Sequence, residues 1–196
     1  MPDMNTISEL RAMTGAGIVD CKKALDEAGG DLQKAAELLR KKGIAKAGSK
    51  GERATKEGLV DSYIHGNGKV GVLVEVQCET DFVARTEQFK DFVHEVALQI
   101  SATNPLYVSR DMIPAEVVEK EKELAMHEFD GSSKPKEVIE KIATGKLEKY
   151  YSEVCLLDQA FIKDEDKTVG ELLKETIAKT GENIQIKRFA RFALAE

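Results

Sequence analysis

Near the N-terminus, apolar residues recur three and four positions apart, which is the spacing of one face of a helix. This pattern predicts three short helices, over residues 6–14, 18–28 and 31–43, with glycines ending the first two. Thr6 and Glu9 fit a capping box at the start of the first helix, because each side chain can bond a free backbone N–H in the first turn. Three short helices around a small core form a compact domain that is only marginally stable alone.

A segment rich in Lys, Ala, Gly and Ser follows these helices and carries no apolar stripe. We predict a solvated linker over residues 44–57, between a helical domain over 1–43 and a larger domain over 58–196. The basic residues of the linker either keep it soluble or bind nucleic acid. The net charge of −6 for the whole chain favours the first interpretation, so we expect no direct contact with nucleic acid.

The larger domain begins and ends with strand-like patterns. Apolar and polar residues alternate over 58–65 and 70–76, and Gly66-Asn67-Gly68 between them is a strong hairpin turn signal. A third alternating segment covers residues 183–194. Because a two-stranded hairpin is not stable alone, we expect the three segments to form one antiparallel sheet.

Helical spacing dominates the region between these strands. One apolar stripe predicts a core helix, and it consists of Phe89, Phe92, Val93, Val96, Ala97 and Ile100. Further helices are predicted over 114–126, on each side of Gly145 after a break at 131–135, and after the cap residue Thr168, which follows an acidic turn at 164–166. This order predicts an α+β domain in which helices cover a three-stranded antiparallel sheet.

The junction between the second strand and the core helix carries an aromatic residue, Phe82, on a short connection. Thr80 is a candidate helix N-cap, and Phe82 follows it beside the carboxylate of Asp81. An aromatic residue on so short a connection either packs inward and fixes the junction or points outward to contact a partner. The sequence leaves both interpretations open.

The adjacent residues Ile18 and Val19 present a similar alternative. Neighbours in a helix point in different directions, so both side chains cannot face the same core well. Either the apolar face of this helix is wide, or one of the two side chains is exposed and contacts a partner.

Composition narrows the classes of protein that this chain can belong to. It is 42% hydrophobic and 33% charged, which is typical of a soluble globular protein. Tryptophan is absent and aromatic residues make up 6%, which argues against stacking on single-stranded nucleic acid. We find no signal peptide and no apolar stretch of membrane length, and the scattered cysteines fit a reducing compartment. We therefore expect a cytoplasmic protein with no membrane contact.

The sequence contains no recognisable catalytic motif, such as GxSxG, a P-loop or GxGxxG. Glu79 and Asp81 are a pair of carboxylates, but no nucleophile or oxyanion donor accompanies them. The dispersed histidines and cysteines lack the spacing of metal ligands. We expect a protein that is not an enzyme, needs no metal or cofactor, and acts by binding.

Two long stretches resemble the signatures of the elongation factor Ts family. They are residues 10–25 (LRAMTGAGIVDCKKAL) and 78–85 (CETDFVAR). Supporting similarity lies at His65-Gly66 with the strand after it, at 131–136 and at 167–173. The stretches occur in order with matching spacers, and the resemblance covers essentially the whole chain.

The resemblance implies a guanine-nucleotide exchange factor for elongation factor Tu in translation elongation. Such a factor promotes GDP release by disturbing the binding of Mg²⁺ and phosphate, and GTP then displaces it. By the same resemblance, the N-terminal helices form a ubiquitin-associated-type (UBA-like) domain that docks on the partner's G domain through Leu10, Ile18 and Val19.

The resemblance also assigns roles in the larger domain. It implies that the element that intrudes beside the partner's nucleotide and helps dislodge Mg²⁺ consists of Thr80, Asp81, Phe82 and Val83. His65 and Gly66, at the hairpin tip, are implied as a further contact with elongation factor Tu.

Two hypotheses remain about assembly and activity. Longer family members carry a duplicated core and this chain has one, so we expect a symmetric homodimer through the sheet and its terminal strand, giving a two-plus-two complex with elongation factor Tu. The alternative function is a ubiquitin-type or chaperone-like interaction module attached to a scaffold without exchange activity.

Overall fold

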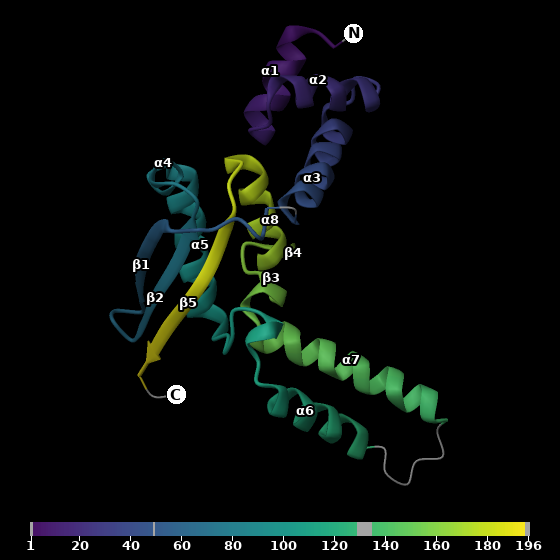
Figure 1. Cartoon of the computed structure of the whole chain (residues 1–196), viewed down its shortest axis with the longest axis vertical. Helices are drawn as coiled ribbons and strands as arrows, with labels where there is room; N and C mark the ends of the chain where they lie inside the picture. Colours follow the sequence, from purple (N-terminus) through teal and green to yellow (C-terminus); the bar gives the residue numbers. More distant parts are fainter. Residues whose placement is uncertain (1, 49, 129–134, 195–196) are drawn as a thin grey trace. The chain divides into compact units, whose positions relative to one another are not determined.

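The computed structural model describes residues 2–48, 50–128 and 135–194, and these contain eight α-helices and five strands (Figure 1). Within the described ranges, every helix is too short or too polar to span a lipid bilayer. In chain order the elements are α1 (Met4–Thr14), α2 (Ile18–Glu27), α3 (Leu32–Gly48), β1 (Glu57–His65), β2 (Val70–Cys78), α4 (Asp81–Ala84), α5 (Glu87–Thr103), η1 (Arg110–Met112), α6 (Ala115–His127), α7 (Lys136–Val154), η2 (Leu156–Asp158), β3 (Ala160–Phe161), β4 (Asp164–Thr168), α8 (Val169–Thr180) and β5 (Ile184–Ala193).

The chain divides into two compact units, and several elements contribute residues to both. The first unit comprises Met1–Leu59, Val76–Val93 and Glu171–Gln185, and the second comprises Val60–Glu75, His94–Gly170 and Ile186–Glu196.

In the first unit, helices α1, α2 and α3 enclose a small core, as predicted. Its buried members are Ile7, Leu10, Cys21, Ala24, Leu25 and Ala35. The prediction of a Thr6–Glu9 capping box is wrong, because Asp3 is the cap and α1 begins earlier. Oδ1 of Asp3 accepts hydrogen bonds from the backbone N–H of Thr6 at 2.7 Å and from its hydroxyl at 2.8 Å. Gly15 ends the helix at a φ of 68°, as expected.

Helix α3 is longer than predicted. Asp31 caps it, since Oδ1 accepts from the backbone N–H groups of Gln33 and Lys34, both at 3.0 Å. The helix then continues beyond the expected end at residue 43 and stops at Gly48. Ala and Lys have high helix propensity, and Ala47 is buried, so this part of the predicted linker is stable as helix.

The three predicted strands form one antiparallel sheet in the order β1-β2-β5. The hairpin turn between β1 and β2 is confirmed, with positive φ at Gly66, Asn67 and Gly68. Gly58 has a φ of +146°, and a Cβ there would lie 2.1 Å from the carbonyl oxygen of Val76. Only glycine allows this close approach at the start of the hairpin.

In the second unit, α5 covers one face of the sheet. His94 lies 3.7 Å from the carboxylate of Asp61 and stacks edge-on against Tyr63, and Arg191 donates to the carbonyl oxygen of Ser101 at 3.3 Å. The apolar stripe predicted for this helix is buried throughout. The opposite face of the sheet carries exposed apolar side chains, namely Val60, Ile64, Leu73 and Phe192. The predicted helical cover is therefore confirmed for one face.

The remaining elements of the second unit include two departures from the prediction. The acidic residues 164–166 lie in strand β4, which pairs with β3, so the predicted acidic turn is wrong. Buried Gln99 supports this small sheet, because its amide donates to the carbonyl of Ala160 at 3.0 Å and accepts from the N–H of Ile162 at 2.9 Å. Helix α7 passes through Gly145 without a break and, with α6, forms a helical hairpin (Figure 1). Of the predicted break, residues 131–134 lie outside the described part of the chain.

Candidate functional site

The turn after β2 holds Phe82 in solvent. Thr80 caps α4 as predicted, and its hydroxyl accepts a hydrogen bond from the backbone N–H of Val83 at 3.4 Å. Residues two apart in a helix point in nearly opposite directions. Ala84 is buried, and Phe82 is accordingly 79% exposed. This exposure excludes the interpretation in which Phe82 packs inward and fixes the junction.

The polar residues beside Phe82 are tied down within the same short segment. Asp81 forms an ion pair with Arg85 at 2.8 Å, one helical turn further on. The Thr86 hydroxyl donates to the carbonyl of Val83 at 2.8 Å and accepts from the N–H of Phe89 at 3.2 Å. The chain therefore passes from α4 to α5 through a second, well-defined turn, which leaves the backbone around Phe82 little freedom.

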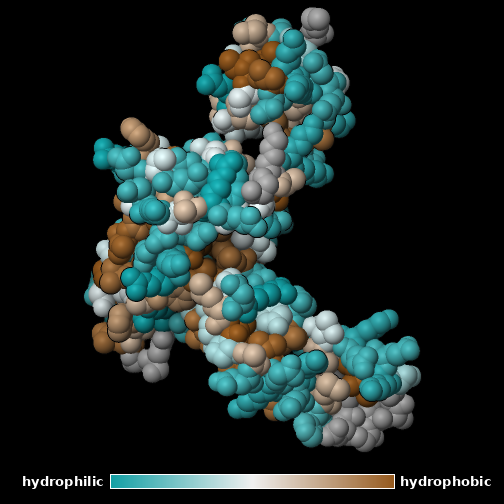
Figure 2. All heavy atoms as spheres, in the orientation of Figure 1, coloured by the Kyte–Doolittle hydropathy of each residue, from teal (hydrophilic) through white to brown (hydrophobic). Residues whose placement is uncertain are grey.

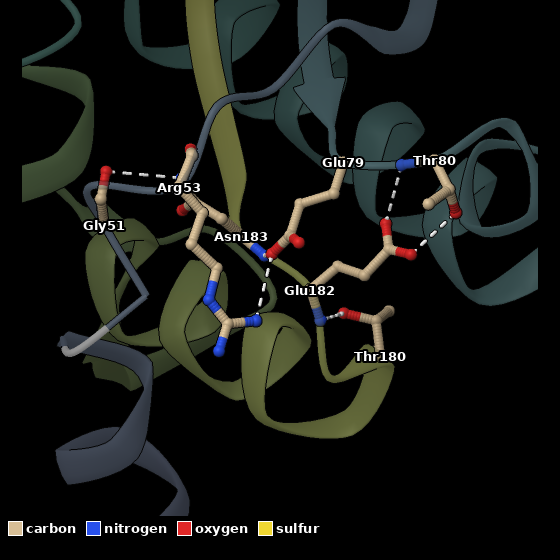
Figure 3. Close-up of polar contacts among 7 residues, drawn as sticks. All are labelled: Gly51, Arg53, Glu79, Thr80, Thr180, Glu182 and Asn183. Carbon is tan, nitrogen blue, oxygen red and sulfur yellow. Dashed lines mark hydrogen bonds and ion pairs between the residues drawn. The ribbon is translucent and has the colours of Figure 1, made fainter.

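Two glutamates attach this turn to the start of β5 in a reciprocal way (Figure 3). The Glu182 carboxylate accepts from the backbone N–H of Thr80 at 3.0 Å and from its hydroxyl at 2.6 Å. The Glu79 carboxylate accepts from the backbone N–H of Asn183 at 2.6 Å. Each segment thus supplies one glutamate that bonds the backbone of the other segment. We call these four residues, Glu79, Thr80, Glu182 and Asn183, the clasp.

The clasp also holds the segment that follows α3. The side-chain amide of Asn183 donates to the carbonyl oxygens of Arg53 at 2.8 Å and Gly51 at 3.3 Å. The guanidinium of Arg53 lies 3.4 Å from the Glu79 carboxylate. Figure 3 shows these side chains converging from three separate stretches of the first unit.

A buried thiol contacts one residue of the clasp. Cys78 donates from Sγ to the carbonyl oxygen of Thr80 at 3.2 Å. Burial, and then the negative charge of Glu182, raise the pKa of the Cys78 thiol to about 11. The thiol therefore stays protonated at neutral pH, and it remains a hydrogen-bond donor to the turn.

The N-terminal helices present a second group of exposed apolar side chains. Ile18 is 51% and Val19 is 65% exposed, so the wide-face explanation of this pair is wrong. Ile18 lines a shallow groove of about 310 Å³ with Met4 and other residues of α1. Figure 2 shows hydrophobic side chains gathered on these helices. Leu10 differs from the expectation, because it is completely buried in the core of the three helices and offers no surface to a partner.

The tip of the β1–β2 hairpin is the third expected contact. His65 and Gly66 are both exposed, and the hydroxyl of Tyr63 lies 3.0 Å from Nδ1 of His65. This contact orients the imidazole at the tip. The hairpin tip belongs to the second unit, whereas Phe82 and Ile18 belong to the first.

The sequence did not reveal the part played by Glu182 and Asn183. Glu182 is 102 residues from Thr80, and no spacing rule connects them. The only local signal is Gly181, whose φ of 80° ends α8 and turns the chain so that an acid and an amide precede the strand. That pattern indicates a helix stop, but it does not indicate which segment the two side chains bind.

Exposed apolar side chains on a fixed backbone are typical of surfaces that contact another protein. Among the residues that the structure describes, no three His, Cys, Asp or Glu side chains lie together in a way that could hold a metal ion. The sequence profile of the family described as elongation factor TS matches residues 45–196. The chain belongs to the elongation factor Ts family.

Individual relatives match over almost the full length. A protein named elongation factor Ts from Thermotoga petrophila is 55% identical over 193 residues, which are 98% of this chain and 96% of that protein. The elongation factor Ts of Anaeromyxobacter sp. strain K is 58% identical over 190 residues, 97% of this chain and 87% of that protein. That of Caldanaerobacter subterraneus is 55% identical over 196 residues, 100% of this chain and 98% of that protein.

Proposed function

We propose that this chain is the guanine-nucleotide exchange factor of elongation factor Tu in translation elongation. The observation that carries this proposal is the 79% exposure of Phe82 on a turn whose backbone is held by the clasp. An exposed aromatic side chain on a mobile loop would lose much of its contact energy in becoming ordered. Phe82 avoids most of that cost, because its backbone is ordered before the partner arrives.

The mechanism begins when Thr80, Asp81, Phe82 and Val83 enter the partner beside its bound nucleotide. Mg²⁺ demands near-ideal octahedral geometry, so a small displacement of its ligands weakens its hold on the phosphates. Burial of Phe82 supplies about 1.5–3 kcal/mol toward that displacement. By linkage, a factor that lowers the partner's affinity for nucleotide is itself displaced by nucleotide, so GTP ends the cycle.

Two further contacts complete the proposed interface. Ile18 and Val19 dock the N-terminal helices, as a UBA-like domain, on the G domain of elongation factor Tu, while buried Leu10 supports the helix beneath them. His65 and Gly66 add a contact from the hairpin tip. The chain forms and breaks no covalent bond in this role, and it acts in the cytoplasm, where translation takes place.

Release of a fluorescent GDP analogue from elongation factor Tu tests this function. We expect substoichiometric amounts of the chain to accelerate release when unlabelled nucleotide is in excess. A chain that binds elongation factor Tu without accelerating release would support the alternative, an interaction module on an inactive scaffold. A chain that neither binds nor accelerates would contradict both the partner and the function.

We also propose that two copies of the chain associate through the uncovered face of the sheet. Ile64, Leu73 and Phe192 are exposed on that face, and Figure 2 shows hydrophobic side chains gathered over β1. Monomers rarely leave a contiguous apolar patch of this kind in water. In a twofold dimer each such residue would be buried twice in the interface, once from each copy.

Phe192→Glu is expected to convert the dimer to a monomer. Phe192 is 74% exposed, so the change costs the isolated fold little, but the interface would have to bury two carboxylates. Sedimentation velocity measures the change, and Leu124→Glu on the exposed side of α6 is the control that should stay dimeric. A wild-type chain that sediments as a fully active monomer would contradict the dimer.

A further inference from the structure

We propose that Glu182 is a positioning residue for Phe82. This inference rests on the proposed exchange function and adds to it a residue that lies outside the signature carrying Phe82. Three features support it: the short length of α4, the two hydrogen bonds that Glu182 accepts, and the reciprocal bond accepted by Glu79.

Helix α4 cannot hold its own orientation. It has four residues, from Asp81 to Ala84, and a single helical turn is unstable in water without tertiary contacts. The direction of Phe82 therefore depends on what fixes the two ends of this turn. At the C-terminal end, the Thr86 hydroxyl bonds the carbonyl of Val83. At the N-terminal end, the fixing group is the carboxylate of Glu182.

Glu182 uses both of its oxygens on one residue. Oε2 accepts from the backbone N–H of Thr80, and Oε1 accepts from the hydroxyl. The hydroxyl proton points to Glu182, so the oxygen of Thr80 keeps its lone pairs for the N–H of Val83. Glu182 thus fixes the Thr80 rotamer that caps α4. The cap in turn fixes the helix that carries Phe82.

The reciprocal bond keeps Glu182 in place. The backbone N–H of Asn183 donates to the Glu79 carboxylate, and the backbone N–H of Thr80 donates to the Glu182 carboxylate. Two hydrogen bonds therefore join the pair Glu79–Thr80 to the pair Glu182–Asn183. Both bonds are charge-assisted, which makes them shorter and stronger than bonds between neutral groups. The Asn183 side chain adds the attachment to Arg53. These bonds therefore hold the backbone that carries Glu182 within reach of Thr80.

If Glu182 acts by positioning Phe82, most of its effect on exchange should require the phenyl ring of Phe82. We therefore propose a double-mutant cycle in which release of fluorescent GDP is measured for Glu182→Ala, for Phe82→Ala and for the double variant. Glu182→Ala is expected to lower the exchange efficiency about tenfold, because the hydrogen bonds that orient the turn are lost. In the Phe82→Ala background the same change should alter the rate less than about twofold, since no aromatic side chain remains to be positioned.

The matched variants separate positioning from a general effect on structure. Glu182→Gln is expected to keep most of the activity, because its amide can accept from the Thr80 N–H and donate to the hydroxyl. Glu52→Ala, at an exposed glutamate of the same unit, removes the same charge and should leave the rate unchanged. If Glu182→Ala does not fold, Glu182→Asp replaces it in the cycle, because the shorter side chain keeps the charge but cannot reach both donors of Thr80.

The outcomes distinguish this inference from the function on which it rests. If Glu182→Ala lowers the rate by the same factor in both backgrounds, or leaves it unchanged in the wild type, the positioning role is overturned and the exchange function stands. If Phe82→Ala itself leaves exchange at the wild-type rate, Phe82 has no role in exchange. The proposed mechanism is then overturned together with the positioning role of Glu182. A strong effect of Glu182→Ala that disappears in the Phe82→Ala background supports the inference.

Discussion

Phe82→Ala is expected to slow the release of GDP from elongation factor Tu by about tenfold to a hundredfold. The phenyl ring is 79% exposed in this chain, and its burial in the partner is worth about 1.5–3 kcal/mol. Each 1.4 kcal/mol corresponds to about a factor of ten. Stopped-flow release of a fluorescent GDP analogue, at a fixed concentration of elongation factor Tu, measures the change directly.

The same variant should keep the stability of the wild-type chain. Substitution of an exposed side chain that supports no core changes the free energy of unfolding by no more than about 0.5 kcal/mol. Leu124→Ala, at an exposed leucine of α6, is the control for loss of apolar surface and should affect neither stability nor exchange. Wild-type exchange by Phe82→Ala would contradict the proposed mechanism.

Phe89→Ala, unlike Phe82→Ala, is expected to destabilise the chain and to lower the free energy of unfolding by about 3–5 kcal/mol. Phe89 lies one element further along the chain, in the first turn of α5, and it is completely buried. Removal of its ring leaves a cavity that the close-packed interior cannot fill by small shifts. Urea unfolding at 25 °C, followed by circular dichroism, gives the difference from the midpoint and slope.

Phe82→Ala and Phe89→Ala form a matched pair, because the atoms removed are the same and only the burial differs. A small loss of stability for Phe89→Ala would show that the interior near α5 is loosely packed. A loss for Phe82→Ala as large as that for Phe89→Ala would show that Phe82 packs inside the chain in solution.

The sequence predicted the elements whose pattern is local and strong. The hairpin follows from Gly66-Asn67-Gly68 between two alternating runs, and all three turn residues have the positive φ that such a turn requires. The apolar stripe of α5 is buried because its period matches the helix. The N-cap Thr80 was also predictable, since its hydroxyl bonds a group only three residues away.

The parts that the sequence did not predict depend on contacts between distant residues or on weak local signals. The clasp joins Thr80 to Glu182, and no periodic pattern records that pairing. Strand β3 has only two residues, too few for an alternation to be detected. The predicted cap Thr6 was wrong, because Asp3 is also a good cap residue and α1 begins earlier than expected.

The expected docking residues also show that a sequence motif does not distinguish buried from exposed positions. Leu10, Ile18 and Val19 were expected to act together, but Leu10 is buried while Ile18 and Val19 are exposed. The helical period places Leu10 on the same face as Ile7, which is also buried. The resemblance does not distinguish these positions, whereas the structure separates the buried residue from the two that form the surface.

The proposed mechanism requires that Phe82 leaves solvent and enters elongation factor Tu beside the nucleotide site. The most direct test is the structure of this chain bound to nucleotide-free elongation factor Tu. We expect the phenyl ring of Phe82 to be buried against the G domain, with Thr80 still bonded to Glu182. A complex in which Phe82 remains exposed to solvent, far from the nucleotide site, would contradict it.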